Sequence, residues 1–556
     1  MRILFATVAA DGHFNPLTGI ALHLKEGGHD IRWYTGKNYA ARLQRLGIAH
    51  LPFQRAREIN GDNIAELFPE RVRLRGPALI RFDFEQVFVS NAEKYFEDIC
   101  EIDETFRFDV LFCDGAFMAA RLVREALHKR VCAVGPGPVL STSKDVPPNF
   151  LGLKPAKTAA GRMLHRVMAV AMDRMVLARG TAIYNRVLAK HGIAPVKGSI
   201  YDEFYGAADV IFQSGVPGFE YPRSEINTKL RFVGPLLPRS AAAGRPFPYA
   251  DKLKPEQRVI LVSQGTVDNK EPRKLIIPAL EALRDTGALL IVGTGHSHTE
   301  ELRRSFPQDN VIIEDYVDFG VVLERADLFV CNGGFGSVLL SLSRGVPLLV
   351  AGVREGKNDV NARVDYFGVG IDLHTESPKT DAIRVAAKRL LGEPRWRQNA
   401  ARLRDELRQY RPYELIDAYL ADELDAGGPG APRPEAPACR AQRLGSRDAD
   451  CGRRHDRLDP GGTSLRSEPG EDKIEVLHPG RASLLGGLPG TLDGLDVPGK
   501  FADESLVEVQ WREVGRFPRE GPGAAVERHR VHPHDASRVE IVLGVSPGPG
   551  IDADHR

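Results

Sequence analysis

From Met1 to about Leu424, short continuous apolar runs alternate with longer amphipathic stretches. The runs have the length of β-strands and lack the polar alternation of a half-exposed sheet. Continuous apolar strands separated by helix-length segments are typical of parallel sheets covered on both faces. The sequence therefore predicts two doubly wound, Rossmann-like α/β domains. Their strands are expected at 3–8, 31–34, 110–113, 131–134 and 210–212, and at 259–262, 288–292, 311–313, 328–331 and 347–351.

The two groups of strands are separated by a stretch with neither a helical nor a strand period. Residues 236–249 are rich in Pro, Ala and Gly, which is typical of a linker. We therefore expect an N-terminal domain over 1–235 and a C-terminal domain over 250–425. Since ligands of open parallel sheets bind at the carboxyl ends of the strands, the two domains are expected to face each other across a cleft.

Residues 426–556 differ in composition from the rest of the chain. Gly and Pro are clearly more frequent there, and the first part of the segment has no apolar period. This composition is typical of disorder, and two weak strand-like runs, 474–477 and 539–545, do not change that interpretation. We expect a largely disordered extension, explicable as translation past the natural end of the gene, and assign it no function.

Composition and charge narrow the class of protein. Hydrophobic residues are 42% and charged residues 27% of the chain, and a net charge of +1 gives no reason to expect a nucleic-acid partner. The first apolar run stops before Asp11, too early for a membrane span, and no cleavage site follows. We expect a cytoplasmic protein without a stable membrane anchor. The six cysteines form no C-x-x-C pair, and the nearest candidate zinc ligands (Cys439, Cys451 and His455) lack a second close pair, so neither disulfides nor a metal is expected.

Two candidate catalytic residues follow the ends of predicted strands. His13 is expected in the loop after the first strand, before a helix opened by Pro16, and Asp114 ends the strand at 110–113. A carboxylate that accepts from one imidazole nitrogen stabilises the imidazolium, and the other nitrogen can then take a proton from a hydroxyl. The alternatives are that His13 is a loop histidine that caps a helix and that Asp114 caps the helix after it.

Glycine turns follow two strands of the C-terminal group. Gly265 and Thr266 come after the strand at 259–262, and Gly-Gly-Phe-Gly-Ser at 333–337 leads from the strand at 328–331 into a helix. Consecutive backbone N–H groups at a helix N-terminus favour a diphosphate, and the Thr266 hydroxyl can also face a phosphate. Neither turn is a P-loop, and each alone also fits an ordinary tight turn.

Together these blocks resemble one family, the nucleotide-sugar-dependent UDP-glycosyltransferases with the two-domain GT-B fold, in particular their bacterial natural-product and macrolide branch. The resemblance covers roughly residues 1–425. It implies inverting, metal-independent transfer of a sugar from a UDP- or dTDP-linked donor to a hydroxyl of a small apolar acceptor, such as a phenolic or macrolide-like natural product. The N-terminal domain would bind the acceptor and the C-terminal domain the donor. The blocks are GHFNP, DVLFCDGAF, VSQGT, DNVIIEDYVDFGVVLERADLFVCNGGFGS and RGVPLLVAGVREGKNDVNARVDYFGVGIDL.

The resemblance also implies roles for individual residues. His13 matches the general base and Asp114 the acid that orients it. Tyr316 matches the ring that stacks on the donor base, and Val317 the residue whose backbone pairs with that base. The phosphate cradle falls on Thr266, Asn332, Gly334, Gly336 and Ser337, and the contacts to the sugar fall on Glu355, Lys357 and Asn358.

The chain departs from the family pattern at three places on the donor side. Asn332 replaces a histidine and carries no positive charge. Leu340 replaces a glutamate that grips the ribose hydroxyls, and it cannot accept a hydrogen bond. Lys357 and Asn358 replace an Asp-Gln pair that binds the sugar hydroxyls, and Glu355 and Asp359 are nearby. These changes predict altered donor recognition: a deoxyribose nucleotide or a deoxysugar, which needs fewer hydroxyl contacts, is compatible with the site, and UDP-glucose is not the default donor.

On the acceptor side, Met168, Met172 and Met175 are expected on one face of a helix, where methionine suits an adaptable apolar pocket. Phe14, Met168 and Met172 are the predicted acceptor contacts. A methionine stripe of this kind is also compatible with an ordinary core. Four arginines in the same region are compatible with a solvated face, which we favour over an anionic membrane surface; they are Arg162, Arg166, Arg174 and Arg179.

Two other functions stay open. A binding protein could retain the fold with an eroded donor site, although it would not need both His13 and Asp114. A nucleotide-sugar epimerase of the same fold would need no acceptor, and the two residues would then lose their assigned roles. The sequence predicts no cofactor besides the nucleotide-sugar co-substrate, and it leaves the donor sugar, the acceptor and the oligomeric state open.

Overall fold

The computed structural model describes residues 1–238, 246–265, 270–426, 507–509 and 543–545. Thr266, part of the predicted linker and nearly all of the predicted disordered extension lie outside the described residues. Within that extension, β14 (Val507–Val509) pairs antiparallel with β15 (Leu543–Val545), which falls inside the predicted run at 539–545.

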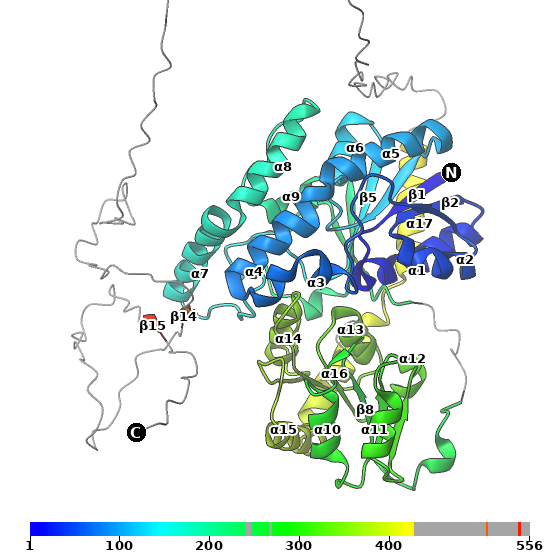
Figure 1. Ribbon diagram of the computed structural model, residues 1–556, viewed down its shortest axis with the longest axis vertical. Coiled ribbons are helices and arrows are strands. Elements are labelled where there is room, and N and C mark those ends of the chain that lie inside the picture. Colours follow the sequence, from blue (N-terminus) through cyan, green and yellow to red (C-terminus); the bar gives the residue numbers. More distant parts are fainter. Residues whose placement is uncertain (239–245, 266–269, 427–506, 510–542, 546–556) are drawn as a thin grey trace, which may run out of the picture. The chain divides into compact units, whose positions relative to one another are not determined.

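The N-terminal part of the chain (Figure 1) forms a seven-stranded parallel sheet. The strands are in the order β3-β2-β1-β4-β5-β6-β7. The order runs outward from β1 in both directions, which is the doubly wound pattern, with ligands expected where it reverses. The strands are β1 (Arg2–Ala6), β2 (Asp30–Thr35), β3 (Ala49–Pro52), β4 (Val110–Asp114), β5 (Arg130–Gly135), β6 (Val210–Ser214) and β7 (Leu230–Gly234).

The C-terminal part forms a second parallel sheet, of six strands, with the order β10-β9-β8-β11-β12-β13. Its order runs outward from β8 in the same way, so the prediction of two doubly wound domains is confirmed. We call the two parts the N-lobe and the C-lobe. The strands are β8 (Val259–Ser263), β9 (Leu289–Gly293), β10 (Val311–Glu314), β11 (Leu328–Cys331), β12 (Leu348–Val350) and β13 (Gly370–Asp372).

All ten strands predicted for the two lobes are present. Among the described residues of the lobes, the sequence analysis missed three strands, β3, β7 and β13, and each of them is an edge strand. An edge strand has one sheet neighbour and keeps polar or half-exposed residues, so its apolar run is broken. The burial of β7, for example, is interrupted by the exposed Arg231.

Helices cover both sheets. In the N-lobe they are α1 (Asp11–Glu26), α2 (Ala40–Arg45), α3 (Ile64–Leu67), α4 (Gly76–Asp83), α5 (Ala92–Phe106), α6 (Ala120–Ala126), α7 (Ala159–Ala171), α8 (Ala178–Lys190) and α9 (Ile200–Gly206), with π-helical segments η3 (Phe84–Phe88) and η5 (Met172–Leu177). In the C-lobe they are α10 (Ile276–Leu283), α11 (Thr299–Ser305), α12 (Phe319–Val322), α13 (Phe335–Ser343), α14 (Lys357–Tyr366), α15 (Thr380–Gly392) and α16 (Pro394–Leu407), and α17 (Pro412–Ala426) ends the series. Short 3-10 turns are η1 (Lys37–Tyr39), η2 (Pro69–Arg73), η4 (Val89–Asn91), η6 (Pro217–Phe219) and η7 (Ala250–Lys252). Within the described part of the chain, no helix is both long and apolar enough to span a membrane.

The C-lobe strands bury alternate side chains in two separate cores. In β8, Val259 and Leu261 belong to one core, whereas Ile260 and Val262 belong to the other. Successive side chains of a strand point to opposite faces, so a sheet covered on both faces needs apolar residues at every position. This explains why the strands appear in the sequence as unbroken apolar runs.

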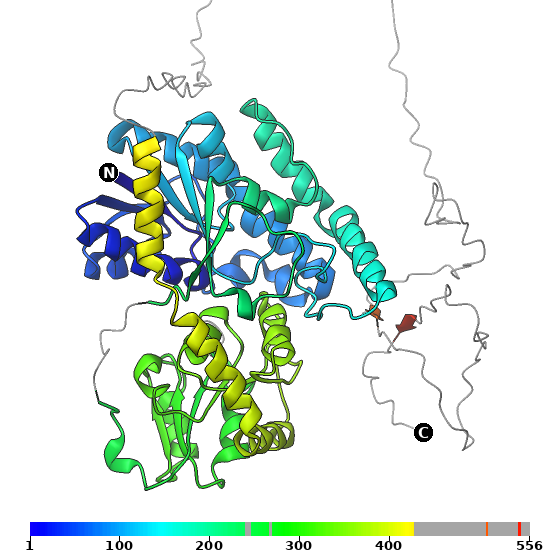
Figure 2. The ribbon, with the colours of Figure 1, turned by 180° about the vertical axis from the view of Figure 1, so that it is seen from behind.

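The last described helix of the lobes, α17, packs on the N-lobe although it follows the C-lobe in sequence. Figure 2 shows it in yellow along the back of the N-lobe. Ile416 and Leu420 are buried in the N-lobe core, and Asp417 accepts a hydrogen bond from His23 at 2.7 Å. The boundaries at 235, 249 and 425 remain predictions, but the apolar side chains of this helix stabilise the N-lobe.

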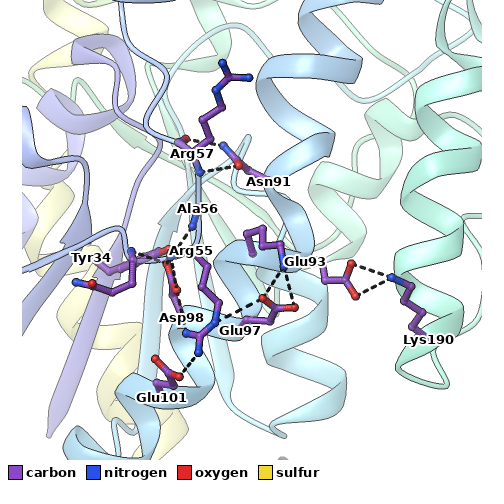
Figure 3. A network of polar contacts seen from close by, with 12 residues as sticks. Tyr34, Arg55, Ala56, Arg57, Asn91, Glu93, Glu97, Asp98, Glu101 and Lys190 are labelled. Carbon is purple, nitrogen blue, oxygen red and sulfur yellow. Dashed lines mark hydrogen bonds and ion pairs between the residues drawn. The ribbon is translucent and has the colours of Figure 1, made fainter. Parts of the chain in front are cut away.

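A buried carboxylate anchors the loop that follows β3. Asp98, on α5, accepts hydrogen bonds from the Tyr34 hydroxyl at 2.6 Å and from the backbone N–H groups of Gln54 and Arg55 at 3.0 Å (Figure 3). The Arg55 side chain then reaches outward to the exposed Glu101. Asp98 thus fixes the start of this loop, and Asn91 holds the backbone of Arg57 farther along it (Figure 3).

We expect Asp98→Ala to lower the free energy of unfolding by about 3 kcal/mol, because several buried donors lose their acceptor at once. The melting temperature should fall by several degrees in a calorimetric scan. Glu101→Ala, at the exposed end of the same network, is the matched control and should change stability by no more than about 0.5 kcal/mol. Equal effects of the two substitutions would contradict this account.

Candidate active site

His13 lies in the first turn of α1, not in a loop before it. The helix begins at Asp11, after the extended Ala10, so the predicted helix start at Pro16 is wrong by five residues. Asp11 favours this earlier start, because a negative charge in the first turn is stabilised by the helix dipole. Pro16 is accommodated inside the helix, where it forfeits one backbone hydrogen bond. The helix therefore fixes the backbone of His13.

His13 and Asp114 are in contact, as the sequence analysis predicted for a catalytic pair. His13 Nδ1 donates to Asp114 Oδ1 at 2.8 Å. Asp114 is 1% exposed and also accepts from the backbone N–H groups of Val8 at 3.1 Å and Ala116 at 2.9 Å. Three donors hold this carboxylate, and its bond to Nδ1 leaves Nε2 of His13 as the proton acceptor.

The alternative role of Asp114 as a helix cap is not what the structure shows. Helix α6 begins at Ala120 with Ala119 as its N-cap residue, several residues after Asp114. The neighbouring Cys113 is fully buried, and this burial, followed by the charge of Asp114, raises the pKa of its thiol well above the usual value. Cys113 is therefore a packing residue and not a nucleophile.

The aromatic residue beside His13 is one that the sequence analysis missed. Phe88, at the end of η3, has its ring centroid 6.3 Å from that of His13. Phe14, which was predicted to contact the acceptor, is fully buried and stacks on Trp33 at 4.4 Å and on Tyr39 at 4.2 Å. Phe14 thus supports α1 from the core, and we do not retain it among the proposed acceptor contacts.

The predicted methionine stripe is divided between two environments. Met172 is buried in the N-lobe core, Met168 is half-buried, and Met175 is 71% exposed. The π-helix η5 begins at Met172, and its wider turn shifts the register of the residues after it. A helical spacing of three and four residues therefore no longer places all three on one face.

The glycine turn after β11 forms the N-terminus of α13. Gly334 is the N-cap residue, and no side chain caps the helix. The N–H groups of Phe335, Gly336 and Ser337 lie in the first turn, where a helix offers them no internal acceptor. Uncapped N–H groups at the positive end of a helix are suited to bind an anion such as a diphosphate.

Asn332 ties this turn to the end of β8. Its Nδ2 donates to the Gln264 carbonyl at 2.5 Å, and the residue is buried. Gly265 has a φ of +83°, and a Cβ there would approach Asn332 Nδ2 to 2.9 Å. Asn332 thus joins the turn after β11 to the end of β8.

The other predicted donor residues lie on loops at the carboxyl ends of the C-lobe strands. Tyr316, between β10 and α12, is 76% exposed, whereas the side chain of Val317 is buried in the core. Leu340, on α13, is half-buried and packs against the same core. It thus presents an apolar side chain where the family pattern has a carboxylate.

The residues predicted to contact the sugar lie at the N-terminus of α14 and already have partners. Lys357 Nζ donates to Glu355 Oε2 at 2.8 Å. Asn358 Nδ2 donates to the Phe150 carbonyl of the N-lobe at 2.7 Å. The structure thus brings Glu355 and Lys357 together but directs Asn358 toward the other lobe.

The two halves of the candidate site are joined through their helices. Helix α1, which carries His13, packs against α13, whose N-terminus is the glycine turn after β11 (Figure 1). On the same side, a Cβ at Gly215, after β6, would contact the side chains of Phe335 and Leu339 on α13. His13 and the N-terminus of α13 therefore lie on neighbouring helices of different lobes.

Comparisons with known proteins agree with this architecture. Residues 279–421 match the family described as the C-terminal domain of erythromycin biosynthesis protein CIII-like proteins. The chain is 33% identical to 4'-demethylrebeccamycin synthase of Lentzea aerocolonigenes over 405 residues, which are 73% of this chain and 95% of that protein. It is 26% identical to UDP-glycosyltransferase 2 of Phaeomoniella chlamydospora, over 76% of this chain and 95% of that one.

Solved structures of similar fold are also glycosyltransferases. The calicheamicin glycosyltransferase CalG4 aligns with a TM-score of 0.59 at 20% identity, over 76% of this chain and 99% of that chain. The spinosyn rhamnosyltransferase SpnG, in complex with thymidine diphosphate, aligns with a TM-score of 0.55 at 17% identity, over 76% and 100%. At such identities the likeness establishes the fold, which is that of a GT-B glycosyltransferase. The chain itself belongs to the UDP-glycosyltransferase family, in the group related to natural-product glycosyltransferases.

We expect Gly333→Ala to damage the glycine turn after β11. Gly333 has a φ of +85°, and a Cβ there would overlap Asn361 Oδ1. The strained backbone and the clash together should lower the free energy of unfolding by about 2 kcal/mol or more and weaken nucleoside-diphosphate binding.

Gly336→Ala is the matched control for stability, because a Cβ at Gly336 meets no atom within 4 Å. Thermal melts should show that this variant is as stable as the wild type, since alanine is the better helix residue. Similar melting temperatures for the two variants would contradict the assigned role of Gly333.

Proposed function

We propose that this protein transfers a sugar from a nucleoside-diphosphate sugar to a hydroxyl of a small, largely apolar acceptor, with inversion at the anomeric carbon. The observation that carries the proposal is the hydrogen bond from His13 to the buried Asp114. His13 lies on α1, which packs against α13, the helix whose N-terminus is proposed to bind the diphosphate. Membership of the glycosyltransferase family supports the reaction class.

In the proposed reaction, Nε2 of His13 takes the proton of the acceptor hydroxyl as its oxygen attacks the anomeric carbon. The bond between that carbon and the phosphate oxygen breaks, and the nucleoside diphosphate leaves with the electron pair. Attack from the face opposite the leaving group inverts the configuration. Asp114 holds Nδ1 and stabilises the imidazolium that forms, without itself being protonated.

The N-terminus of α13 is proposed to stabilise the negative charge that develops on the leaving diphosphate. Gly334, Gly336 and Ser337 supply the turn and its N–H groups, and Asn332 stays in the proposal as the residue at the family's histidine position. Such preorganised donors stabilise a leaving group without a metal ion, and we expect activity to persist in EDTA. Thr266, outside the described residues, stays in the proposal as a further phosphate contact.

The donor is proposed to be a UDP- or dTDP-sugar, with dTDP preferred. The exposed ring of Tyr316 is available to stack on a base, and the backbone of Val317 to pair with it. The half-buried Leu340 offers no acceptor for ribose hydroxyls, which favours a nucleotide with fewer of them. The complex of the spinosyn rhamnosyltransferase with thymidine diphosphate supports the same base. Glu355 and Lys357 are the proposed sugar contacts.

The acceptor is proposed to be a phenolic or macrolide-like natural product. Phe88 beside His13 and the half-buried Met168 offer apolar surface near the base and on α7. The relatives named for rebeccamycin and calicheamicin chemistry support an acceptor of this class.

The test is nucleoside-diphosphate release from a panel of UDP- and dTDP-sugars, with and without a mixed pool of phenolic and macrolide acceptors. Release that depends on acceptor supports the transferase. Donor binding without turnover over the whole panel would instead indicate a binding protein. Interconversion of the sugar without acceptor would indicate an epimerase.

We expect His13→Ala to reduce acceptor-dependent release by roughly 10²- to 10⁴-fold, the usual contribution of a general base. Asp114→Asn should have an effect of similar order, because an amide cannot stabilise the imidazolium. His23→Ala is the matched control, since His23 lies on the same helix in another His–Asp pair, with Asp417. Full activity of His13→Ala would exclude its role as the base.

We expect Leu340→Glu to shift the donor preference toward UDP-sugars by about 10-fold or more, because a carboxylate can accept from the ribose 2'-hydroxyl that deoxyribose lacks. The ratio of kcat/KM for matched UDP- and dTDP-sugars measures this shift. Leu340→Gln, a neutral polar control, should give a smaller change. An unaltered ratio in both variants would rule out Leu340 as a determinant of nucleotide choice.

A further inference from the structure

The first turn of α14 holds a loop of the N-lobe. Asp359 Oδ2 accepts from the backbone N–H of Phe150 at 2.5 Å, and Oδ1 accepts from that of Gly152 at 2.8 Å. Asn358 Nδ2 donates to the Phe150 carbonyl at 2.7 Å. Two consecutive side chains of the C-lobe thus bind three backbone groups of one N-lobe loop, which we call the latch loop (residues 149–152).

The backbone on both sides of these contacts is held in an unusual conformation. Phe150 has a φ of +65° and Glu355 a φ of +57°, in the left-handed region that residues other than glycine rarely adopt. Gly152 and Gly356 also have positive φ, and a Cβ at Gly356 would approach the Phe150 ring to 3.4 Å. Strained residues of this kind persist only where surrounding contacts fix them, and they are frequent at functional sites.

A second contact one turn further along α14 holds the same region. Arg363 Nη2 donates to Glu220 Oε1 at 2.6 Å, and Nη1 donates to the Asp359 carbonyl at 2.9 Å. Glu220 Oε2 in turn accepts from the backbone N–H of Val139, in the connection that leads to the latch loop. Arg363 and Glu220 are both buried, so breaking this pair would leave an uncompensated charge.

Both carboxylate oxygens of Asp359 accept hydrogen bonds from the latch loop. It is 8% exposed, and burial raises its pKa, while the hydrogen bonds from Phe150 and Gly152 act in the opposite direction. A buried carboxylate needs such donors, and both of its oxygens have one. Neither oxygen therefore needs a sugar hydroxyl as a partner.

The latch loop connects this contact with the proposed acceptor side. The Phe150 ring lies 5.7 Å from that of Tyr201. Tyr201 and Asn149 line a recess together with Met172, at the start of η5. Tyr201 is buried, and its hydroxyl has no hydrogen-bond partner within the described residues. The position of the latch loop thus shapes the wall of this recess.

We propose that Asn358 and Asp359 are positioning residues that fasten the latch loop of the acceptor lobe to the donor helix α14, and that they do not bind the donor sugar. The kinetic consequence of this inference rests on the proposed function. It is that acceptor binding by the N-lobe depends on contacts made by the C-lobe.

The test compares Asp359→Asn with Asp365→Asn in the full chain. Asparagine keeps the size of the side chain but has one acceptor oxygen, so one of the two N–H groups loses its partner. Asp365 lies on the same helix and pairs with Lys154 of the N-lobe at the surface, which makes it the matched control. Hydrogen exchange of the Phe150 and Gly152 amides should accelerate by roughly tenfold or more in Asp359→Asn and stay unchanged in the control.

The kinetic measurement separates positioning from sugar binding. In Asp359→Asn and Asn358→Ala, we expect the acceptor KM to rise by about fivefold or more, with donor KM and nucleoside-diphosphate affinity within about twofold of the wild type. A raised donor KM with an unchanged acceptor KM would identify a sugar contact and overturn the proposal, as would unchanged hydrogen exchange. If the wild type transfers no sugar, the proposed function fails. In that case the positioning role is tested by hydrogen exchange and nucleotide binding alone. Faster exchange of the Phe150 and Gly152 amides in Asp359→Asn, with unchanged UDP and dTDP affinities, would support it, and unchanged exchange would overturn it.

Discussion

A carboxylate removed from water must receive hydrogen bonds from the protein, and the candidate active site is built around one that does. Asp114 ends β4 next to the end of β1, and the parallel sheet places the Val8 N–H and the side chain of His13 within its reach. The backbone donors hold the carboxylate, and the carboxylate selects the tautomer and orientation of the imidazole. The early start of α1 belongs to the same arrangement, because it gives His13 a helical backbone instead of a mobile loop.

The same requirement recurs at two other buried carboxylates. Asp98 holds the loop after β3 through its backbone N–H groups, and Asp359 holds the latch loop in the same way. In each case a side chain on a helix fixes a loop at the carboxyl edge of a sheet. The rigid elements thereby determine the positions of loops that their own sequence would leave flexible.

Much of the fold and of the candidate site could be predicted from the sequence. The physical reasons for this also explain which features could not be predicted. Central strands covered on both faces are unbroken apolar runs, so all nine of them in the two lobes were found, together with the edge strand β10, whereas the edge strands β3, β7 and β13 were not. His13 and Asp114 were found because each follows such a run. The start of α1 was missed because Pro16 was given more weight than Asp11. The partners of Asn358 and Asp359 could not be found, since they lie about two hundred residues away in another lobe. The division of the methionine stripe depends on η5, and a π-helical turn has no periodic signal of its own.

Because α17 packs on the N-lobe, it restricts where the chain can be cut or recombined with another. In topological terms the C-lobe is an insertion: the N-lobe begins before it and is completed after it. A cut in the linker at 236–249 would leave the N-terminal fragment without Ile416 and Leu420, and so with an open apolar face where α17 belongs. A split or chimeric protein that exchanges C-lobes would therefore need two junctions, one before β8 and one between α16 and α17. It would keep α17 from the same parent as the sheet on which it packs.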